Sequence, residues 1–314
     1  MNRSISASVF PSPWKFGQIK PIPKKGSLLD PKNWRPIVIN TSLSKILEHV
    51  LNKQLQNHLE ENDIMSPVQH AYRKNRSCQS AWLEIDTLVA RARNEGRSAA
   101  LMCTDQSAAF NLVKADIIVA KLRVFGLDEA SLHLIRSYLT GRSTTCTVGS
   151  ATSPVTHLQS GVGEGSVVGP LFFVATLCDV SVVSARAIDR LGRDHAIDVF
   201  IHLIAYADDV SAIIVADSEA EIQLAVDILM EEFVSYFSSA GLAMNPEKSE
   251  LILFRRGRQS QELKVGNQVE STRVKLLGVT VEKGYQFNSH SSNVSAAVKL
   301  KVEKISNAVK LLDY

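Results

Sequence analysis

The sequence predicts an α+β fold in which a small β-sheet carries acidic residues and is backed by helices. Short apolar runs bounded by turn-forming residues indicate the strands, and longer segments with apolar residues every three or four positions indicate amphipathic helices. The composition is that of a globular protein, because 45% of the 314 residues are hydrophobic and 21% are charged. This length is enough for one large domain or two modest domains with a real core.

The elements follow one another along the whole chain. A proline-rich stretch, 8–26, predicts extended structure and turns. Helices are predicted at 42–63, 78–94, 114–125 and 128–139, from about 165, and at 218–240 and 292–314. Strands are predicted at 99–103, 203–205, 210–215, 250–254 and 273–277, with a β-hairpin within 143–160.

Charge and cysteine content bound the function loosely. The formal net charge of +3 allows a nucleic-acid partner without requiring one. Clusters of basic residues do not decide the question, because each is by itself typical of a solvated face. The four cysteines are scattered with no close pair at metal spacing, so the sequence indicates neither a disulfide framework nor a zinc site and favours a reducing compartment. The longest apolar run, 167–177, is too short to span a bilayer. No signal-peptide pattern is present, and both ends read as cut from a longer chain.

Residues 203–216, LIAYADDVSAIIVA, place Asp208 and Asp209 between two apolar runs. Neighbouring carboxylates repel each other, and strand interiors are depleted in Asp. A polar hairpin tip explains an ordinary Asp-Asp pair, because Asp is a good turn former. Here the apolar neighbours keep the pair close to a core, where carboxylates need a cation or a metal. Hard divalent ions bind carboxylates together with substrate phosphates, so the pattern indicates a Mg²⁺ site for phosphoryl transfer.

Such a site calls for another carboxylate from a separate strand, and Asp105 is the candidate. It follows the apolar run 99–103 and precedes a predicted helix, which places it at the edge of a sheet. The alternative is an ordinary helix N-cap. On these residues alone, an unrelated metal-dependent phosphotransferase also remains open.

Seven blocks carry a resemblance to a known family. In order they are NWRPIVI, QHAYRKNRS, CTDQSAAF, SGVGEGSVVGPLFF, AYADDV, GLAMNPEKSELILF and VKLLGV. Together they resemble the reverse-transcriptase domain of non-LTR (LINE-type) retrotransposons, with group II intron enzymes as more distant relatives. The resemblance covers essentially the whole chain. It implies an RNA-directed DNA polymerase that extends a DNA primer on an RNA template.

The resemblance also implies a right-hand polymerase fold and its division along the chain. Fingers are expected at 1–98 and a palm with a small antiparallel sheet at 99–256. A fingers-associated hairpin near 143–160 lies within the palm segment. The primer-grip hairpin and the start of the thumb are expected at 257–314.

The catalytic residues that the resemblance implies centre on three aspartates. Asp105, Asp208 and Asp209 match the metal-binding residues of the palm, which would hold two Mg²⁺ ions, with Mn²⁺ as a substitute. Two such ions clamp the attacking 3′-hydroxyl and the reacting phosphates. Lys248 resembles a lysine near the leaving pyrophosphate, a plausible proton donor. Tyr206 would support the primer end, and a core aromatic is its alternative.

Further residues match positions that hold the incoming nucleotide. Lys24, or Lys25 one position later, and Arg35 match the fingers residues that grip the triphosphate. Phe110 matches the bulky residue beneath the sugar, where a ring excludes a 2′-hydroxyl. Plain core packing is the alternative for Phe110.

Three more residues match positions that contact the template and primer. Arg73 resembles a fingers residue near the template, and Leu277 with Gly278 resembles the primer-gripping hairpin. For these residues, as for Lys248, a solvated or structural role is the alternative.

The chain departs from the family pattern beside the nucleotide. The family has Pro-Gln-Gly-Ser where this chain has Gly-Glu-Gly-Ser at 163–166, so Glu164 replaces a neutral amide and Gly165 is retained. Asn111 stands where the family often has Asp. Glu164 favours a second hypothesis, in which a decayed or repurposed domain binds nucleic acid without polymerising.

The resemblance implies partners as well as chemistry. These are an RNA template, a DNA primer and deoxynucleoside triphosphates, without a membrane. A longer polyprotein with a nuclease domain is expected, acting in the cytoplasm and nucleus of a host cell.

Overall fold

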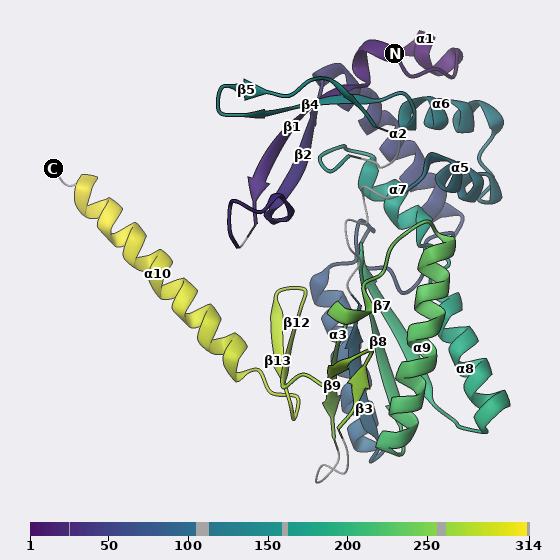
Figure 1. The fold of residues 1–314 in the computed structure, drawn as a ribbon, viewed down its shortest axis with the longest axis vertical. Coiled ribbons are helices and arrows are strands. Elements are labelled where there is room, and N and C mark those ends of the chain that lie inside the picture. The colour runs from purple at the N-terminus through teal and green to yellow at the C-terminus, as the bar shows by residue number, and fades with distance from the viewer. Residues whose placement is uncertain (25, 105–112, 159–162, 256–261, 313–314) are drawn as a thin grey trace.

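The computed structural model describes residues 1–312 apart from 25, 105–112, 159–162 and 256–261. Two larger sheets organise the described chain, one in the upper half and one in the lower half of Figure 1. Helices cover both faces of the lower sheet and lie beside the upper sheet, which confirms the α+β prediction.

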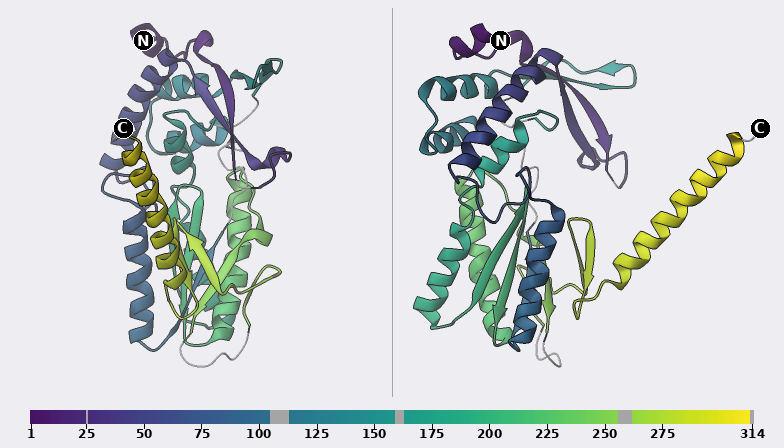
Figure 2. Two further views of the ribbon diagram at one scale, coloured as in Figure 1. Left: turned by 90° about the vertical axis from the view of Figure 1, so that its left-hand side faces the viewer. Right: turned by 180° about the vertical axis from the view of Figure 1, so that it is seen from behind.

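The lower sheet is a four-stranded antiparallel sheet in the order β7-β8-β3-β9. Its strands are β3 (Ser98–Cys103), β7 (Phe200–Tyr206), β8 (Asp209–Ala216) and β9 (Glu250–Phe254). The helix α3 (Cys78–Asn94) packs on one face, and α8 (Val182–His195) and α9 (Glu219–Ser239) lie on the other (Figures 1 and 2). Both faces are therefore covered, which explains why every residue of β8 after Asp209 is buried.

The two faces of this sheet belong to separate apolar clusters. Leu101 packs in a cluster with Ile85 and Val89 of α3. Met102 belongs to the larger cluster that includes Phe233 and Phe237 of α9. Because successive strand residues point to opposite faces, β3 stabilises both layers. Burial of each such side chain contributes about 1.5–3 kcal/mol.

The upper sheet has five strands from two distant parts of the chain. β1 (Phe16–Pro23) pairs antiparallel with β2 (Trp34–Asn40) and parallel with β4 (Ser143–Val148). Two short strands, β5 (Ala151–Thr152) and β6 (Thr156–His157), pair with β4. The predicted extended opening and the predicted hairpin within 143–160 are both confirmed.

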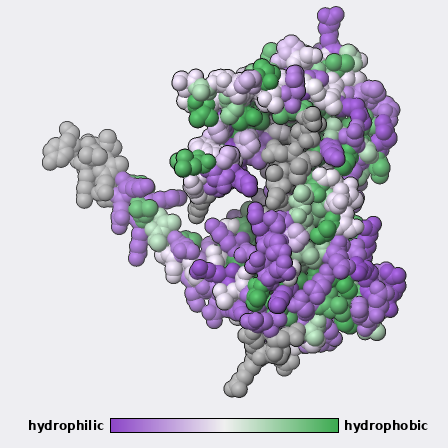
Figure 3. Space-filling model, in the orientation of Figure 1, coloured by the Kyte–Doolittle hydropathy of each residue, from purple (hydrophilic) through white to green (hydrophobic). Residues whose placement is uncertain are grey.

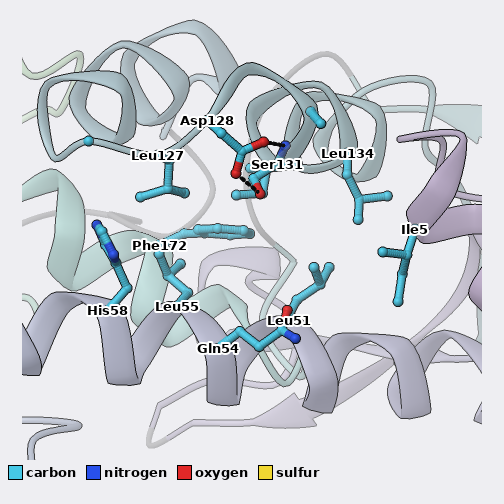
Figure 4. Close-up of a pocket in the computed structure, with 13 residues that line it drawn as sticks. Ile5, Leu51, Gln54, Leu55, His58, Leu127, Asp128, Ser131, Leu134 and Phe172 are labelled. Carbon is cyan, nitrogen blue, oxygen red and sulfur yellow. Dashed lines mark hydrogen bonds between the residues drawn. The ribbon is translucent and has the colours of Figure 1, made fainter.

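Four helices pack together near the upper sheet. They are α2 (Ser42–Glu61), α5 (Ala115–Val124), α6 (Glu129–Leu139) and α7 (Gly169–Thr176). A cavity of about 320 Å³ lies between α2, α6 and the short N-terminal helix α1 (Asn2–Ser6), with Leu55, Leu134 and Phe172 in its lining (Figure 4). None of its lining residues comes from the lower sheet.

The C-terminal part forms two hairpins and a projecting helix. β10 (Lys264–Val265) pairs with β11 (Gln268–Val269), and β12 (Arg273–Leu276) pairs with β13 (Val279–Glu282). α10 (Asn288–Leu312) extends away from the rest of the molecule (Figures 1 and 2). Its surface mixes hydrophilic and hydrophobic side chains (Figure 3), including Val294 and Val298. No helix among the described residues combines the length and apolar character needed to cross a bilayer.

Most of the predicted elements are confirmed, one begins later than predicted, and several observed elements were not predicted. The helix predicted from about 165 begins at Gly169, because Gly165 has a φ of 107° that a right-handed helix does not allow and Pro170 stands in the first turn. The helix α8 was not predicted from the sequence.

The predicted boundary at residue 98 falls after a helix of the lower layer. α3 precedes that boundary and packs against the four-stranded sheet. The chain therefore enters the lower layer before the first predicted palm residue.

Candidate functional site

The Asp-Asp pair lies at a tight turn at one end of the four-stranded sheet. The register of β7 and β8 pairs Tyr206 with Asp209, which leaves Ala207 and Asp208 as the turn. Ala207 has a φ of 56° and is buried, whereas Asp208 is half-buried and Asp209 is exposed, so the turn packs against the protein on one side and leaves its carboxylates accessible. The predicted hairpin is confirmed, and its two carboxylates stand at the sheet edge.

The segment 66–77, between α2 and α3, holds this turn in place. Val68 accepts a hydrogen bond from the backbone N–H of Ala205, and the N–H of His70 donates to the Ala205 carbonyl, each at 2.8 Å. The Gln69 side-chain oxygen accepts from Ala71 at 2.9 Å and from Ala207 at 3.0 Å. Gln69 is 1% exposed. One buried amide therefore ties the turn to this segment.

The end of β3 lies beside the same turn. Cys103 pairs with Ser211, and Thr104 donates from both its N–H and its hydroxyl to the carbonyl of Val210, at 3.0 and 2.8 Å. The strand predicted before Asp105 is thus confirmed. Asp105 itself, like Phe110, lies outside the described residues.

A pocket of about 270 Å³ lies on one side of the turn and is called the Arg35 pocket here. Its lining residues come from five separate parts of the chain and are Arg35, Tyr72, Gly163, Glu164, Gly165, Pro170 and Asp208. Three residues predicted to face the nucleotide, Arg35, Glu164 and Gly165, are therefore brought together with the predicted metal ligand Asp208.

An ion pair lies within the Arg35 pocket. The Nε of Arg35 is 3.6 Å from Oε2 of Glu164, and the two side chains are 57% and 24% exposed. Close packing against β2 sets the position of Glu164, since its carbonyl accepts from the Val38 N–H at 2.6 Å. At Gly165 a Cβ would meet the Val38 carbonyl at 2.6 Å, and φ is 107°. Only glycine fits there.

A buried carboxylate, that of Glu48, also binds the loop that carries Glu164 and Gly165. Glu48 of α2 is fully buried and accepts from Asn40 Nδ2 at 3.0 Å, Ser44 Oγ at 2.6 Å and the N–H of Val167 at 2.7 Å. Arg142 donates to Asn40 Oδ1 at 3.0 Å and is also buried. The network joins β2, α2, the residue before β4 and the loop that carries Glu164.

Two tyrosines lie near Asp208. Burial and the charge of Asp208 raise the pKa of Tyr72. A hydrogen bond with Cys78 and burial raise the pKa of Tyr206 to about 12. Both phenols are therefore neutral at pH 7, and neither adds charge to the pair of carboxylates.

A second pocket, of about 280 Å³, lies on the other side of the turn and is called the Lys248 pocket. Its lining residues are Cys103, Thr104, Asp209, Ser211, Lys248, Glu250, Lys275, Leu276 and Leu277. Lys248 comes from a short 3₁₀ helix, Pro246–Lys248, and Leu277 from the turn of the β12–β13 hairpin. The structure therefore brings Asp209, Lys248 and Leu277 together.

The backbone of the β12–β13 turn is left-handed at two positions. Leu277 has a φ of 47° and Gly278 a φ of 84°. Within the Lys248 pocket, burial raises the pKa of Glu250, and burial raises the pKa of the Cys103 thiol to about 12.

Four predicted residues with described positions line neither pocket, namely Lys24, Arg73, Tyr206 and Gly278. Lys24 directly follows β1 in the exposed connection to β2, where its N–H donates to the Asn33 carbonyl at 2.7 Å, and Lys25 lies outside the described residues. The side chain of Arg73 is 13% exposed. Its guanidinium binds the Glu60 carboxylate at 3.1 Å and donates to the carbonyls of Met65 and Ser66. Arg73 thus holds its own segment together.

Sequence reasoning missed Gln69, Tyr72 and Glu48. Gln69 and Tyr72 are in the block QHAYRKNRS, from which only Arg73 was selected. Glu48 stands directly after Leu47 on the buried side of α2. An acidic residue at a core position of an amphipathic helix is the signal that could have identified it.

Comparisons with known proteins agree with this geometry. The sequence profile of the family described as "Reverse transcriptase (RNA-dependent DNA polymerase)" matches residues 22–281. A retrovirus-related Pol polyprotein from the type-1 retrotransposable element R2 of Popillia japonica is 27% identical over 76% of this chain and 32% of its own length. The RNA-directed DNA polymerase from the mobile element jockey of Drosophila melanogaster is 23% identical over 97% of this chain and 33% of its own length. The chain spans about a third of these relatives.

Solved structures identify the fold. Apo telomerase from Candida tropicalis, truncated from its C-terminal domain, superposes with a TM-score of 0.54 at 13% identity, over 88% of this chain and 55% of that one. Telomerase from Candida albicans in complex with a telomeric RNA fragment gives a TM-score of 0.55 at 12% identity, over 88% of this chain and 47% of that one. The fold is therefore the right-hand polymerase fold. With the family profile covering most of the chain, this protein belongs to the reverse transcriptase family.

Proposed function

We propose that this chain is the RNA-directed DNA polymerase domain of a non-LTR retrotransposon and extends a DNA primer on an RNA template. The proposal rests on the Asp208–Asp209 turn, which the segment 66–77 holds in place. Asp208 lines the Arg35 pocket and Asp209 lines the Lys248 pocket. A binding module has no need for two repelling carboxylates side by side on a turn whose backbone is tied to a buried amide.

The residues of the turn fit a divalent cation in their chemistry. Carboxylate oxygens are the ligands that Mg²⁺ prefers, usually one or two of them together with substrate phosphates. Among the residues with described positions no group of three metal-binding side chains occurs, and the predicted third carboxylate, Asp105, falls outside them. Asp208 and Asp209 would hold two Mg²⁺ ions with Asp105, and Mn²⁺ would substitute. The ions would supply electrostatic stabilisation of the reacting phosphates.

The other residues of the site would contact the nucleotide and the primer. The exposed guanidinium of Arg35 binds the triphosphate, with Lys24 as a second cation. Lys248 gives a proton to the leaving pyrophosphate. Tyr206, Leu277 and Gly278 position the primer end.

The rest of the proposal concerns the whole protein. Residues 1–98 act as fingers, 99–256 as palm and 257–314 as primer grip and start of the thumb, with Arg73 shaping the template side. The chain works within a longer polyprotein that carries a nuclease, in the cytoplasm and nucleus of its host.

Primer extension tests this function. The purified chain is given an RNA template, a DNA primer, Mg²⁺ and the four deoxynucleotides, and Asp208→Asn is assayed beside it. The parent should extend the primer and Asp208→Asn should not, while both bind the template. Binding by a folded parent without extension would instead favour the decayed domain, to which Glu164 points.

A further inference from the structure

We infer that Tyr72 is a substrate-contacting residue of the Arg35 pocket, where the face of its ring packs against the nucleoside part of the incoming nucleotide. This inference rests on the proposed function and adds a residue to it. It stands on the exposure of the side chain, the backbone that presents it and the composition of the pocket.

The first observation is the contrast between Tyr72 and its neighbours. Gln69, His70 and Ala71 are 1%, 3% and 1% exposed, whereas Tyr72 is 49% exposed. A tyrosine ring is a large apolar surface that usually contributes to a core or an interface. Here a rigid, buried segment presents the ring to a pocket instead of packing it inside.

The second observation is the backbone of Tyr72, which has a φ of 55°. A bulky residue rarely adopts this left-handed conformation, which Gly and Asn tolerate much better. The surroundings enforce it: the preceding Ala71 N–H is bound by Gln69, and the Tyr72 carbonyl accepts from Gln56 at 3.3 Å. A strained residue held in this way is a candidate for function.

The third observation is the composition of the pocket. Its described lining holds a cation at Arg35, carboxylates at Glu164 and Asp208, and one aromatic ring, that of Tyr72. If the triphosphate lies between Arg35 and the Asp208 turn, the remaining surface of this pocket meets the nucleoside. Aromatic rings are the side chains on which bases stack regardless of sequence.

Three substitutions separate the ring from its hydroxyl and from the backbone strain. Tyr72→Phe keeps the ring, and Tyr72→Leu removes the ring but keeps apolar bulk. Tyr72→Asn relieves the backbone strain while removing both the ring and the apolar bulk. Loss of one stacking contact weakens nucleotide binding about 5- to 150-fold. We therefore expect KM to rise by that factor in Tyr72→Leu and Tyr72→Asn, and to change less than about twofold in Tyr72→Phe.

Thermal unfolding distinguishes this contact from a structural role. Tyr72→Asn should keep or raise Tm, because Asn tolerates the left-handed backbone, while its KM rises. If Tyr72 were needed only for folding, its substitution would lower the Tm of the protein and leave the KM of the folded fraction unchanged. Unchanged KM in both Tyr72→Leu and Tyr72→Asn would overturn the inference.

A binding measurement separates this inference from the proposed polymerase activity. Calorimetry reports binding of a deoxynucleoside triphosphate to the chain on an RNA template with a dideoxy-terminated primer, where no extension occurs. Parent binding that weakens in Tyr72→Leu supports the inference even if the parent never extends a primer. Equal nucleotide binding by the parent and Tyr72→Leu overturns only the role of Tyr72. A folded parent that does not bind nucleotide overturns both the role of Tyr72 and the proposed polymerase function.

Discussion

The guanidinium of Arg35 lies 3.6 Å from the carboxylate of Glu164, and both side chains line the pocket that also contains Asp208. The phosphates of a nucleotide and the Glu164 carboxylate would therefore compete for one cation. Because Arg35 is more than half exposed, solvent screens the pair, and its contribution is about 0.2–1 kcal/mol. Displacing Glu164 from Arg35 therefore costs a bound nucleotide only about this small amount.

Replacing Glu164 by the neutral amide should strengthen nucleotide binding. Glu164→Gln frees Arg35 for the phosphates, so KM for each deoxynucleotide should fall about 1.4- to 5-fold, with kcat nearly unchanged. Single-nucleotide primer extension at varied nucleotide concentration measures both constants. The advantage of the variant should shrink at high salt, because exposed charges are screened.

A matched control exists outside the pocket. Glu129→Gln breaks another exposed ion pair, in which Glu129 contacts Arg123 at 2.8 Å, and it should leave KM unchanged. Identical KM values for Glu164→Gln and the parent would mean that the carboxylate does not compete with the nucleotide.

Gln69 should matter for turnover because it binds the turn directly. Gln69→Leu leaves the buried N–H groups of Ala71 and Ala207 without their acceptor, which costs about 1–3 kcal/mol of stability for each. We also expect kcat to fall at least tenfold, because a small displacement of reacting groups costs up to about 100-fold in rate. Urea unfolding and primer extension measure the two effects.

Ser66→Ala is the control for that variant. Ser66 is 3% exposed in the same segment, and its hydroxyl has no hydrogen-bond partner among the described residues. Its removal should leave kcat and stability close to the parent values. A Gln69→Leu variant as active as Ser66→Ala would remove Gln69 from the supports of the turn.

Among the acidic residues of α2, Glu48 should be the one whose substitution lowers the stability of the protein most. In Glu48→Gln the amide nitrogen replaces an oxygen that accepts hydrogen bonds, so one buried donor loses its acceptor, with a cost of about 1–3 kcal/mol. Glu61→Gln, on the exposed surface of the same helix, should change the free energy of unfolding by less than about 0.5 kcal/mol. Equal effects of the two substitutions in urea unfolding would contradict the network around Glu48.

Phe110 stays a prediction from the sequence, since it lies outside the described residues. If its ring excludes a 2′-hydroxyl, Phe110→Val should incorporate ribonucleotides, with a smaller loss for deoxynucleotides. Competition between the two nucleotide types in primer extension measures the discrimination. An unchanged ratio in a folded variant would return Phe110 to core packing.

Local patterns predicted the elements around the turn well. Apolar runs predict β3, β8 and β9 because both faces of that sheet are covered, and the helical spacing of α2 follows from its buried stripe. The helix α8 escaped prediction because its buried residues, Val183, Ala187 and Leu191, stand among charged and small ones.

Contacts between distant residues escaped prediction for a different reason. Gln69 reaches Ala207, and Glu48 reaches Val167, across more than a hundred residues each. Nothing in either local sequence encodes the partner. The resemblance to a family placed Arg35 and Glu164 near the nucleotide, but the ion pair between them depends on how the loop crosses β2.

The position of β3 in the middle of its sheet has a consequence for how the chain folds during synthesis. Both of its neighbours, β8 and β9, are translated more than a hundred residues after it. A nascent chain therefore carries an apolar strand with two unpaired edges until most of the domain has left the ribosome. Contacts this distant slow folding, and exposed strand edges favour aggregation. β3, the first strand of this sheet to be made, is thus the strand that most needs protection during synthesis.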